Sequence, residues 1–195
     1  MKTITSKNTS VNKDKLPKVY TILNKHNAYG THIFDVGCGK YTRHIKGYAQ
    51  SHICEHWHGF DPYNKPESYN AKTRNAAHEE KYKIYGEMNP NIFISSNVLN
   101  VIQRGQGEYL QKIFKMMKDI DECYITVYEG DKSGIGRITK KDCWQENRKL
   151  IDYLEEVKMA YRNTHIYDYE SGTPQHSIDI KYGMIRVISN KVNIK

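Results

Sequence analysis

The chain has 195 residues, of which 38% are hydrophobic and 11% aromatic, and its formal net charge at pH 7 is +8. This length supports one sizeable core but is short for two typical domains, so we expect a single domain over residues 14–195. The sequence contains no apolar run near the roughly 20 residues that span a bilayer and begins without a signal-peptide core, which predicts a cytoplasmic protein.

Residues 1–13 are rich in Ser, Thr, Asn and Lys, which is typical of a flexible basic tail. Together with the net charge, this tail favours an anionic partner, and nucleic acid is the commonest such partner. A helix is predicted next, with Asp14 as its N-cap. Its apolar stripe contains Val19, Tyr20 and Leu23.

A first buried strand is predicted over residues 32–36, and it runs into the turn Asp35-Val36-Gly37-Cys38-Gly39. Because glycine has no Cβ atom, Gly37 and Gly39 allow a positive φ and a close approach of the backbone to a ligand. In an open α/β sheet, a turn at this place binds the nucleotide part of a ligand. A lone Gly-x-Gly also occurs in ordinary strand-to-helix turns, so the interpretation needs independent support.

That support comes from Asp61, which ends a second predicted strand over residues 57–61 and follows Gly39 by 22 positions. The spacing is close to the roughly 20 positions at which an acid at the tip of the second strand reaches ribose hydroxyls. A helix is expected between the two strands, over residues 41–50. Residues 65–80 are expected to form a loop and a short helix, and residues 81–85 a third strand.

Four potential metal ligands, His52, Cys54, His56 and His58, alternate along the chain before Asp61. In one strand they would share a face, and imidazole and thiolate are zinc ligands. Four positions along one strand extend too far to converge on a single ion, so we assign no metal site to them.

Residues 91–100 are predicted to form an apolar strand that ends in small polar groups, including Asn97. In an open parallel sheet the carboxyl ends of the strands face the ligand, so these groups should lie near it. The alternative is that they only serve the chemistry of a turn. A helix over residues 108–120 and a strand over residues 123–128 are predicted next.

The long charged loop after this strand, residues 129–148, is the expected place for the reacting partner, because such loops often carry function. Glu129 and Asp131 are the candidate general bases. A solvated surface loop is the alternative interpretation. The candidate side chains for binding an acceptor are Arg137, Lys140, Trp144 and Arg148.

The last elements are a helix over residues 150–161 and a hairpin over residues 177–189, which turns at Tyr182-Gly183. The four cysteines are widely scattered, which favours reduced thiols over a disulfide framework. We therefore expect an α/β fold, with a mostly parallel sheet flanked by helices and an antiparallel C-terminal strand.

Three features have the order and spacing found in class I S-adenosylmethionine-dependent methyltransferases: the turn at residues 35–39, Asp61 and residues 96–102. The chain resembles this family over roughly residues 33–153. Residues 130–147 also resemble small methyltransferase-like proteins of phages and mobile elements. These resemblances imply a single-domain Rossmann-like methyltransferase fold and S-adenosylmethionine as cofactor.

The resemblance also implies a role for each matching residue. Asp35 would bind the amino group of the methionine part, and Gly37 and Gly39 would let the backbone approach the ligand. Asp61 would accept hydrogen bonds from the ribose hydroxyls, and Asn97 would lie beside the sulfonium.

The chain departs from the family at Tyr41, where a third glycine is usual. The signatures of amino-group and cytosine-C5 DNA methyltransferases are also absent from the sequence, so a standard mechanism of DNA-base methylation does not follow. The expected function is methyl transfer to an unidentified acceptor, with nucleic acid or a nucleotide favoured.

The alternative is a non-catalytic protein of the same fold that binds nucleic acid, a protein partner or the nucleotide itself. A nicotinamide-dependent oxidoreductase is disfavoured, because Thr42 stands where the dinucleotide fingerprint requires glycine. The sequence predicts no membrane association and leaves the oligomeric state open.

Overall fold

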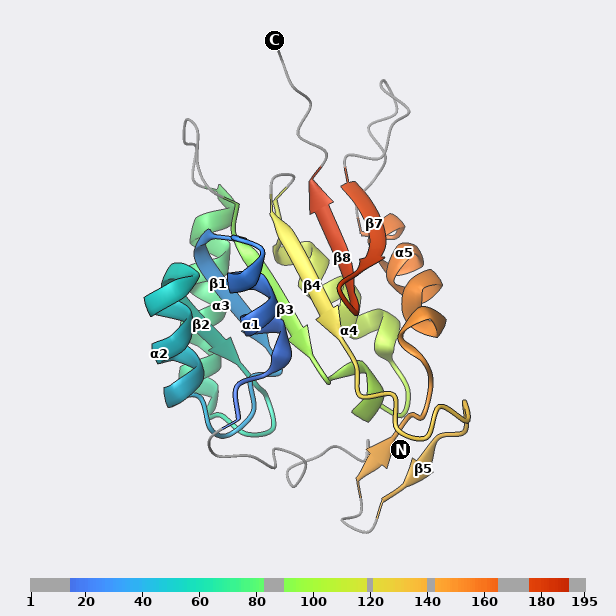
Figure 1. The fold of residues 1–195 in the computed structure, drawn as a ribbon. Coiled ribbons are helices and arrows are strands. Elements are labelled where there is room, and N and C mark those ends of the chain that lie inside the picture. Colours follow the sequence, from blue (N-terminus) through green and yellow to red (C-terminus); the bar gives the residue numbers. More distant parts are fainter. Residues whose placement is uncertain (1–14, 83–89, 119–120, 140–142, 165–175, 190–195) are drawn as a thin grey trace.

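The computed structural model describes residues 15–82, 90–118, 121–139, 143–164 and 176–189, along which strands and helices alternate in the manner of an α/β protein (Figure 1). The helices are α1 (Lys18–Lys25), α2 (Arg43–His52), α3 (Glu67–Tyr82), α4 (Gln106–Met116) and α5 (Leu154–Arg162), with short 3-10 segments η1 (Leu99–Val101) and η2 (Leu150–Tyr153). The strands are β1 (Gly30–Val36), β2 (Cys54–Phe60), β3 (Ile92–Ser96), β4 (Glu122–Thr126), β5 (Arg137–Ile138), β6 (Trp144–Gln145), β7 (His176–Lys181) and β8 (Met184–Ser189).

Six strands form one sheet in the order β2-β1-β3-β4-β8-β7. Strands β1 to β4 are parallel, and β8 is antiparallel to both β4 and β7. The prediction of a mostly parallel sheet with an antiparallel C-terminal strand is confirmed. Because β1 lies between β2 and β3, the strand order reverses there, and the carboxyl ends of β1 and β3 flank the place where such sheets bind ligands. The small β5–β6 hairpin lies at the same end of the sheet (Figure 1).

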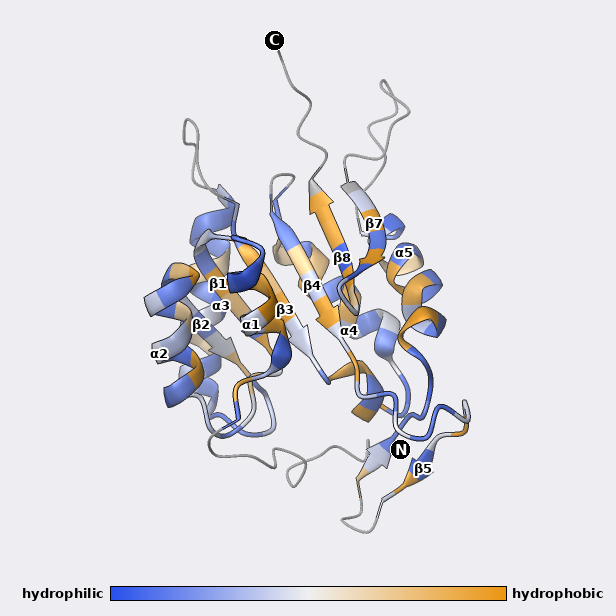
Figure 2. Ribbon diagram, in the orientation of Figure 1, coloured by the Kyte–Doolittle hydropathy of each residue, from blue (hydrophilic) through white to orange (hydrophobic). Residues whose placement is uncertain are grey.

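Apolar residues cover both faces of the sheet and form two clusters. One cluster joins α1 and α2 to the sheet and contains Tyr20, Ile45 and Trp57. The other joins α4 and α5 to the opposite face and contains Phe34 and Phe93. Figure 2 shows hydrophobic residues concentrated on the central strands, whereas the helices carry both kinds of residue. The helices therefore bury one stripe each, as amphipathic surface helices do.

Helix α3 is attached to the sheet mainly by polar groups. Its buried residues are Asn70, Thr73, Ala77 and Glu80, which lie on one stripe at helical spacing. Because alanine is the only apolar residue among them, α3 gains little from hydrophobic burial and depends on hydrogen bonds for its position. The prediction of a loop and only a short helix over residues 65–80 was wrong, because the residues that α3 buries are mostly polar and the sequence shows no apolar stripe there.

The hydrogen bonds that hold α3 reach two places on the sheet. At the first, the Asn70 amide bonds both backbone groups of Asp61, at 2.9 and 3.2 Å, and the Thr73 hydroxyl donates to the Gly59 carbonyl at 2.6 Å. The second is a group of histidines near the other end of the helix, where Glu80 is buried.

The histidine group joins α3 to β1 and β2. The Nδ1 atom of His32 lies 3.0 Å from Nε2 of His58, and the other nitrogen of His32 lies 3.5 Å from the Glu80 carboxylate. The pKa of His58 is lowered to about 4, mainly by burial; the charges of His32, His56 and Lys46 contribute to this lowering, and Glu80 opposes it. An uncharged His58 therefore fits this position, and a protonated one does not.

The four potential metal ligands do not lie on a single strand, which is the arrangement in which they would share a face. His52 ends α2, and β2 begins only at Cys54, whose thiol pKa is raised to about 12 by burial. Among the described residues, no group of three or more His, Cys, Asp or Glu side chains is arranged to hold a metal ion. In the same part of the chain, no helix has both the length and the apolar run needed to cross a membrane.

Several predicted boundaries were also wrong. The first two residues of the strand predicted over 81–85 belong to α3, and the other three lie outside the described residues, as does Asp14. Strand β2 begins three residues earlier than expected, and α4 covers Gln106–Met116 rather than residues 108–120. The hairpin at Tyr182-Gly183 is confirmed, and Tyr182 takes the left-handed φ of 56° that its tight turn requires.

The pKa of His58 predicts how acid acts on the fold. In the unfolded chain His58 takes up its proton near pH 6.5, whereas in the folded protein it does so only near pH 4. Its contribution to stability is therefore complete above about pH 6.5 and is lost as the pH falls to about 4. We expect the free energy of unfolding of His58→Gln, measured in urea at a series of pH values, to improve relative to the wild type across this range. The exposed His78→Gln on α3 is the control, and a similar pH dependence of both variants would contradict the assignment.

Candidate functional site

The two glycines after β1 adopt the positive φ angles that glycine allows at low cost. Their φ values are 95° for Gly37 and 74° for Gly39, in the left-handed region that side chains disfavour. A Cβ atom at Gly37 would also lie 2.2 Å from a methyl carbon of Val98. The turn after β1 thus packs directly against the segment that follows the neighbouring strand β3. Gly37 and Gly39 nevertheless stay partly exposed.

Asp35 is buried beside this turn and takes part in a chain of hydrogen bonds. Its carboxylate accepts a 2.7 Å bond from the Tyr20 hydroxyl, which in turn accepts a 2.8 Å bond from the Trp57 indole N–H. Asp35 is 2% exposed and Tyr20 is fully buried. Helix α1 therefore covers one side of the carboxylate, and a ligand would reach it from the side of the turn.

The pKa of Asp35 is raised to about 7. Burial is the main cause and the negative charge of Asp61 adds to it, while the hydrogen bond from Tyr20 acts in the opposite direction. A carboxyl group with such a pKa is half protonated at neutral pH, and a nearby cation would restore its charge. Strongly shifted groups of this kind concentrate at functional sites.

Asp61 holds the loop after β2 and joins it to the glycine turn. One carboxylate oxygen, Oδ1, accepts from the backbone N–H groups of Tyr63 and Asn64, both at 2.9 Å. The other, Oδ2, accepts from the Gly39 N–H at 2.9 Å and from the Asn64 side-chain amide at 3.0 Å. The predicted proximity of Asp61 to the glycine turn is thus a direct hydrogen bond in this structure.

Lys65 strengthens the connection between the two loops. Its ammonium group donates to the Lys40 carbonyl at 3.0 Å and lies 3.2 Å from the Thr42 hydroxyl. Tyr41, which replaces the third glycine of the related motif, is 39% exposed between these two partners. The turn therefore closes by contacts between the loops and without a third glycine.

The two asparagines after β3 have different surroundings. Asn97 is exposed and takes a left-handed φ of 58°, a conformation that asparagine tolerates well. Asn100 is 2% exposed, and its carbonyl groups accept from the backbone N–H groups of Tyr128 and Glu146 at 3.3 and 2.7 Å. Asn97 is free to face a ligand, whereas Asn100 fixes the segment that follows β4.

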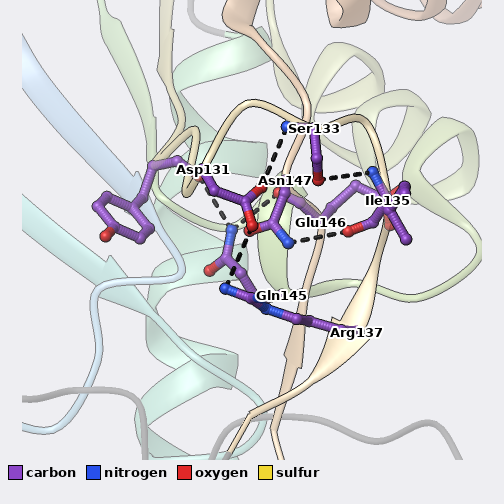
Figure 3. Close-up of polar contacts among 8 residues, drawn as sticks. Asp131, Ser133, Ile135, Arg137, Gln145, Glu146 and Asn147 are labelled. Atoms are coloured by element: carbon purple, nitrogen blue, oxygen red, sulfur yellow. Dashed lines mark hydrogen bonds and ion pairs between the residues drawn. The ribbon is translucent and has the colours of Figure 1, made fainter.

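The two candidate bases lie on that segment in different settings. Glu129 accepts from the Leu150 N–H at 2.7 Å and pairs with Lys132 at 2.9 Å, and these contacts hold its pKa below the usual range. Asp131 is exposed and accepts from the Ser133 N–H at 3.0 Å (Figure 3). The hydrogen bonds from Ser133 lower the pKa of Asp131, and the charge of Arg137 adds to this effect.

The predicted acceptor-binding residues are partly engaged in the fold. Arg137 lies 3.3 Å from Asp131 on the exposed surface of the hairpin. The Trp144 ring packs against Gly136, and its indole N–H donates to Glu146 at 2.7 Å. Arg148 stacks over the Tyr153 ring at 4.3 Å and pairs with Glu156 at 2.6 Å, while Lys140 lies outside the described residues. Among the three described residues of this set, Arg137 is the most accessible.

Sequence reasoning missed several residues that shape the site. Tyr20 and Trp57 were assigned only to the core and to a strand, and nothing in their local pattern indicated the contact with Asp35. Asn64 and Asn70 were not singled out, although an asparagine three residues after a strand-ending acid is a signal for a side-chain capped loop.

Comparisons with known proteins identify the fold. A scan against models of protein families and a search of curated protein sequences both find no match. Among solved structures, the chain is similar to 1,6-didemethyltoxoflavin-N1-methyltransferase from Burkholderia thailandensis, bound to 1,6-didemethyltoxoflavin and S-adenosylhomocysteine. The TM-score is 0.56 at 15% identity, over 88% of this chain and 76% of the other. A sugar N-methyltransferase from Streptoalloteichus gives a TM-score of 0.49 at 9% identity, over 93% and 96% of the two chains.

The chain therefore has the Rossmann-like α/β fold of methyltransferases, as the sequence predicted. At 15% identity the similarity concerns the fold.

The burial of Asp35 should lower the stability of the folded protein whenever this carboxyl group is charged. The rise in the pKa of Asp35 from 3.8 to about 7 corresponds to a cost of about 4 kcal/mol for the charged form. This cost is complete above pH 7. It disappears as the pH falls to about 4, because the folded protein takes up the proton near pH 7 and Asp35 is then uncharged, whereas the unfolded chain takes it up only near pH 4. Asp35→Asn should thus raise the free energy of unfolding in urea at pH 8, by up to about 4 kcal/mol, with little change at pH 4.

The matched control for this experiment is Asp131→Asn, which changes an exposed carboxylate whose pKa is lowered. It should not reproduce the gain at pH 8. Equal stability of Asp35→Asn and the wild type at pH 8 would show that the buried carboxylate carries no such cost.

Proposed function

We propose that this protein is an S-adenosylmethionine-dependent methyltransferase. The observation that carries the proposal is the pair of left-handed glycines between Asp35 and Asp61, at the carboxyl ends of adjacent strands where the strand order reverses. The fold supports it, since a protein of similar fold is a methyltransferase that binds S-adenosylhomocysteine.

The charges at the turn suit the two ends of this cofactor. Asp35 offers a carboxyl group to the amino group of the methionine part, and the approach of a cation would lower its raised pKa and keep it ionised. Asp61 is the acceptor for the ribose hydroxyls, and the exposed Asn97 lies at the carboxyl end of β3 for a contact near the sulfonium. Gly37 and Gly39 leave the backbone open to the chain between these groups.

The bound cofactor would supply a methyl group on a positively charged sulfur, which is already activated for transfer. The residues of this chain then have to align the acceptor and remove its proton. We assign the second task to Asp131, because it is exposed, whereas Glu129 is only partly exposed and accepts the Leu150 backbone N–H. Arg137, which is exposed and lies 3.3 Å from Asp131, is our candidate for orienting an anionic acceptor.

A nucleic acid or a nucleotide is the acceptor that the composition favours. The net charge is +8, and Tyr41, Tyr63 and Tyr128 are 39%, 49% and 62% exposed on loops that leave the carboxyl ends of strands. Exposed aromatic rings beside positive charge are suited to stacking on bases. The resemblance of residues 130–147 to proteins of phages and mobile elements, and a cytoplasmic location, stay predictions.

Calorimetric titration tests the cofactor. S-adenosylhomocysteine should bind the wild type, NAD should not, and Asp35→Ala should weaken the binding at least about tenfold through the lost charge pair. The affinity of the wild type should fall as the pH drops below about 7, since Asp35 then becomes protonated. The absence of S-adenosylhomocysteine binding to the wild type would contradict the proposal.

Transfer of a radiolabelled methyl group to pools of DNA, RNA, protein and small molecules tests catalysis. Asp131→Ala should retain cofactor affinity and lower the transfer rate about a hundredfold, which is typical for the loss of a general base. Ser68→Ala, an exposed change on α3, is the control. Cofactor binding without transfer to any pool would favour the non-catalytic alternative, and equal loss of binding in Asp35→Ala and Asp131→Ala would refute the division of roles.

A further inference from the structure

All four acceptor positions of the Asp61 carboxylate are occupied by groups of the protein itself. A carboxylate has two oxygens with about two lone-pair sites each. Two backbone donors fill the sites of Oδ1, and the Gly39 N–H and the Asn64 amide fill those of Oδ2, all within 3.0 Å. A hydroxyl group that binds to this carboxylate must therefore replace one of the four donors.

Only one of these donors can leave without a change in the backbone. The N–H groups of Gly39, Tyr63 and Asn64 belong to the main chain, and their removal would unfold the turn or the loop. The remaining donor is the Nδ2 group of Asn64, which reaches Asp61 through a side chain with two rotatable bonds. The backbone bond of Asn64 to Oδ1 would persist while its side chain rotates away.

The Asn64 amide also occupies its present place at a cost. Its carbonyl oxygen, Oδ1, is buried and has no hydrogen-bond partner in this structure. The amide cannot turn over to relieve this, because Oδ1 would then face the carboxylate oxygen of Asp61, and two acceptors repel. An unsatisfied buried acceptor costs free energy, and this cost would be recovered when the side chain moves into water.

We propose that the Asn64 side chain is an internal stand-in for the ribose, which occupies the hydrogen-bonding position of a ribose hydroxyl on Asp61 until a ligand hydroxyl displaces it. This inference rests on the proposed function and names the residue that sets its affinity. A hydroxyl and an amide N–H are equivalent donors to a carboxylate, so the exchange conserves the number of hydrogen bonds at Asp61. A molecule without a ribose hydroxyl could not make the exchange and would leave the Asn64 amide bound to Asp61.

Asn64→Ala provides the test, because it removes the competing donor and keeps the backbone bond. Its affinity for S-adenosylhomocysteine, measured by calorimetry, should exceed that of the wild type by about threefold to tenfold, the range expected for one competing hydrogen bond. The gain should also appear with adenosine and be absent with 2′,3′-dideoxyadenosine. Ser68→Ala on the nearby exposed turn of α3 is the matched control and should bind as the wild type does.

The outcomes separate this inference from the proposed function. If the wild type binds S-adenosylhomocysteine and Asn64→Ala binds it equally or more weakly, Asn64 is not a stand-in and only this inference fails. If the wild type does not bind it, the proposed function fails and the inference with it. In the wild type, the side-chain amide resonances of Asn64 should shift on saturation with S-adenosylhomocysteine, and unchanged resonances would overturn the inference even if Asn64→Ala did not fold.

Discussion

The hydrogen bond from the Gly39 N–H to the Asp61 carboxylate joins the two loops from which the candidate site is built. It requires a left-handed Gly39 on one side and a carboxylate at the end of β2 on the other. Asp61 in turn is held by Asn70 of α3, a helix that buries three polar residues and one alanine. The geometry of the site therefore depends on a series of hydrogen bonds more than on apolar packing, and such a site can respond to a ligand that competes with these donors for the Asp61 carboxylate.

Two titratable groups, the buried Asp35 and the half-buried His58, act on the stability of this region in opposite directions. Burial raises the pKa of Asp35 to about 7 and lowers that of His58 to about 4. As the pH falls from about 7 to 4, protonation of Asp35 relieves a cost, while the resistance of His58 to protonation imposes one. The histidine sits where α3 meets the sheet, but Asp35 sits beside the glycine turn, which is why we connect only the carboxyl group with binding.

The sequence predicted the parts of the fold that are encoded locally. Apolar runs located the central strands, and the spacing of Gly39 and Asp61 correctly placed them at adjacent strand ends. The extent of α3 could not be predicted, because its buried stripe is polar and owes its burial to partners such as Gly59 and His32 on other strands. The bond between Tyr20 and Asp35 joins positions 15 residues apart, so neither residue's neighbours in the sequence indicate it. The roles assigned to Asp131 and Arg137 stay predictions.

A crystal structure of the protein with S-adenosylhomocysteine, grown at pH 8 so that Asp35 is ionised, would show whether the ligand binds at the glycine turn and displaces Asn64. We predict that the ligand lies across Gly37 and Gly39, with its amino group on Asp35 and a ribose hydroxyl on Asp61 in place of the Asn64 amide. A ligand bound elsewhere, or bound with its ribose away from Asp61 and the Asn64 amide still in place, would contradict it.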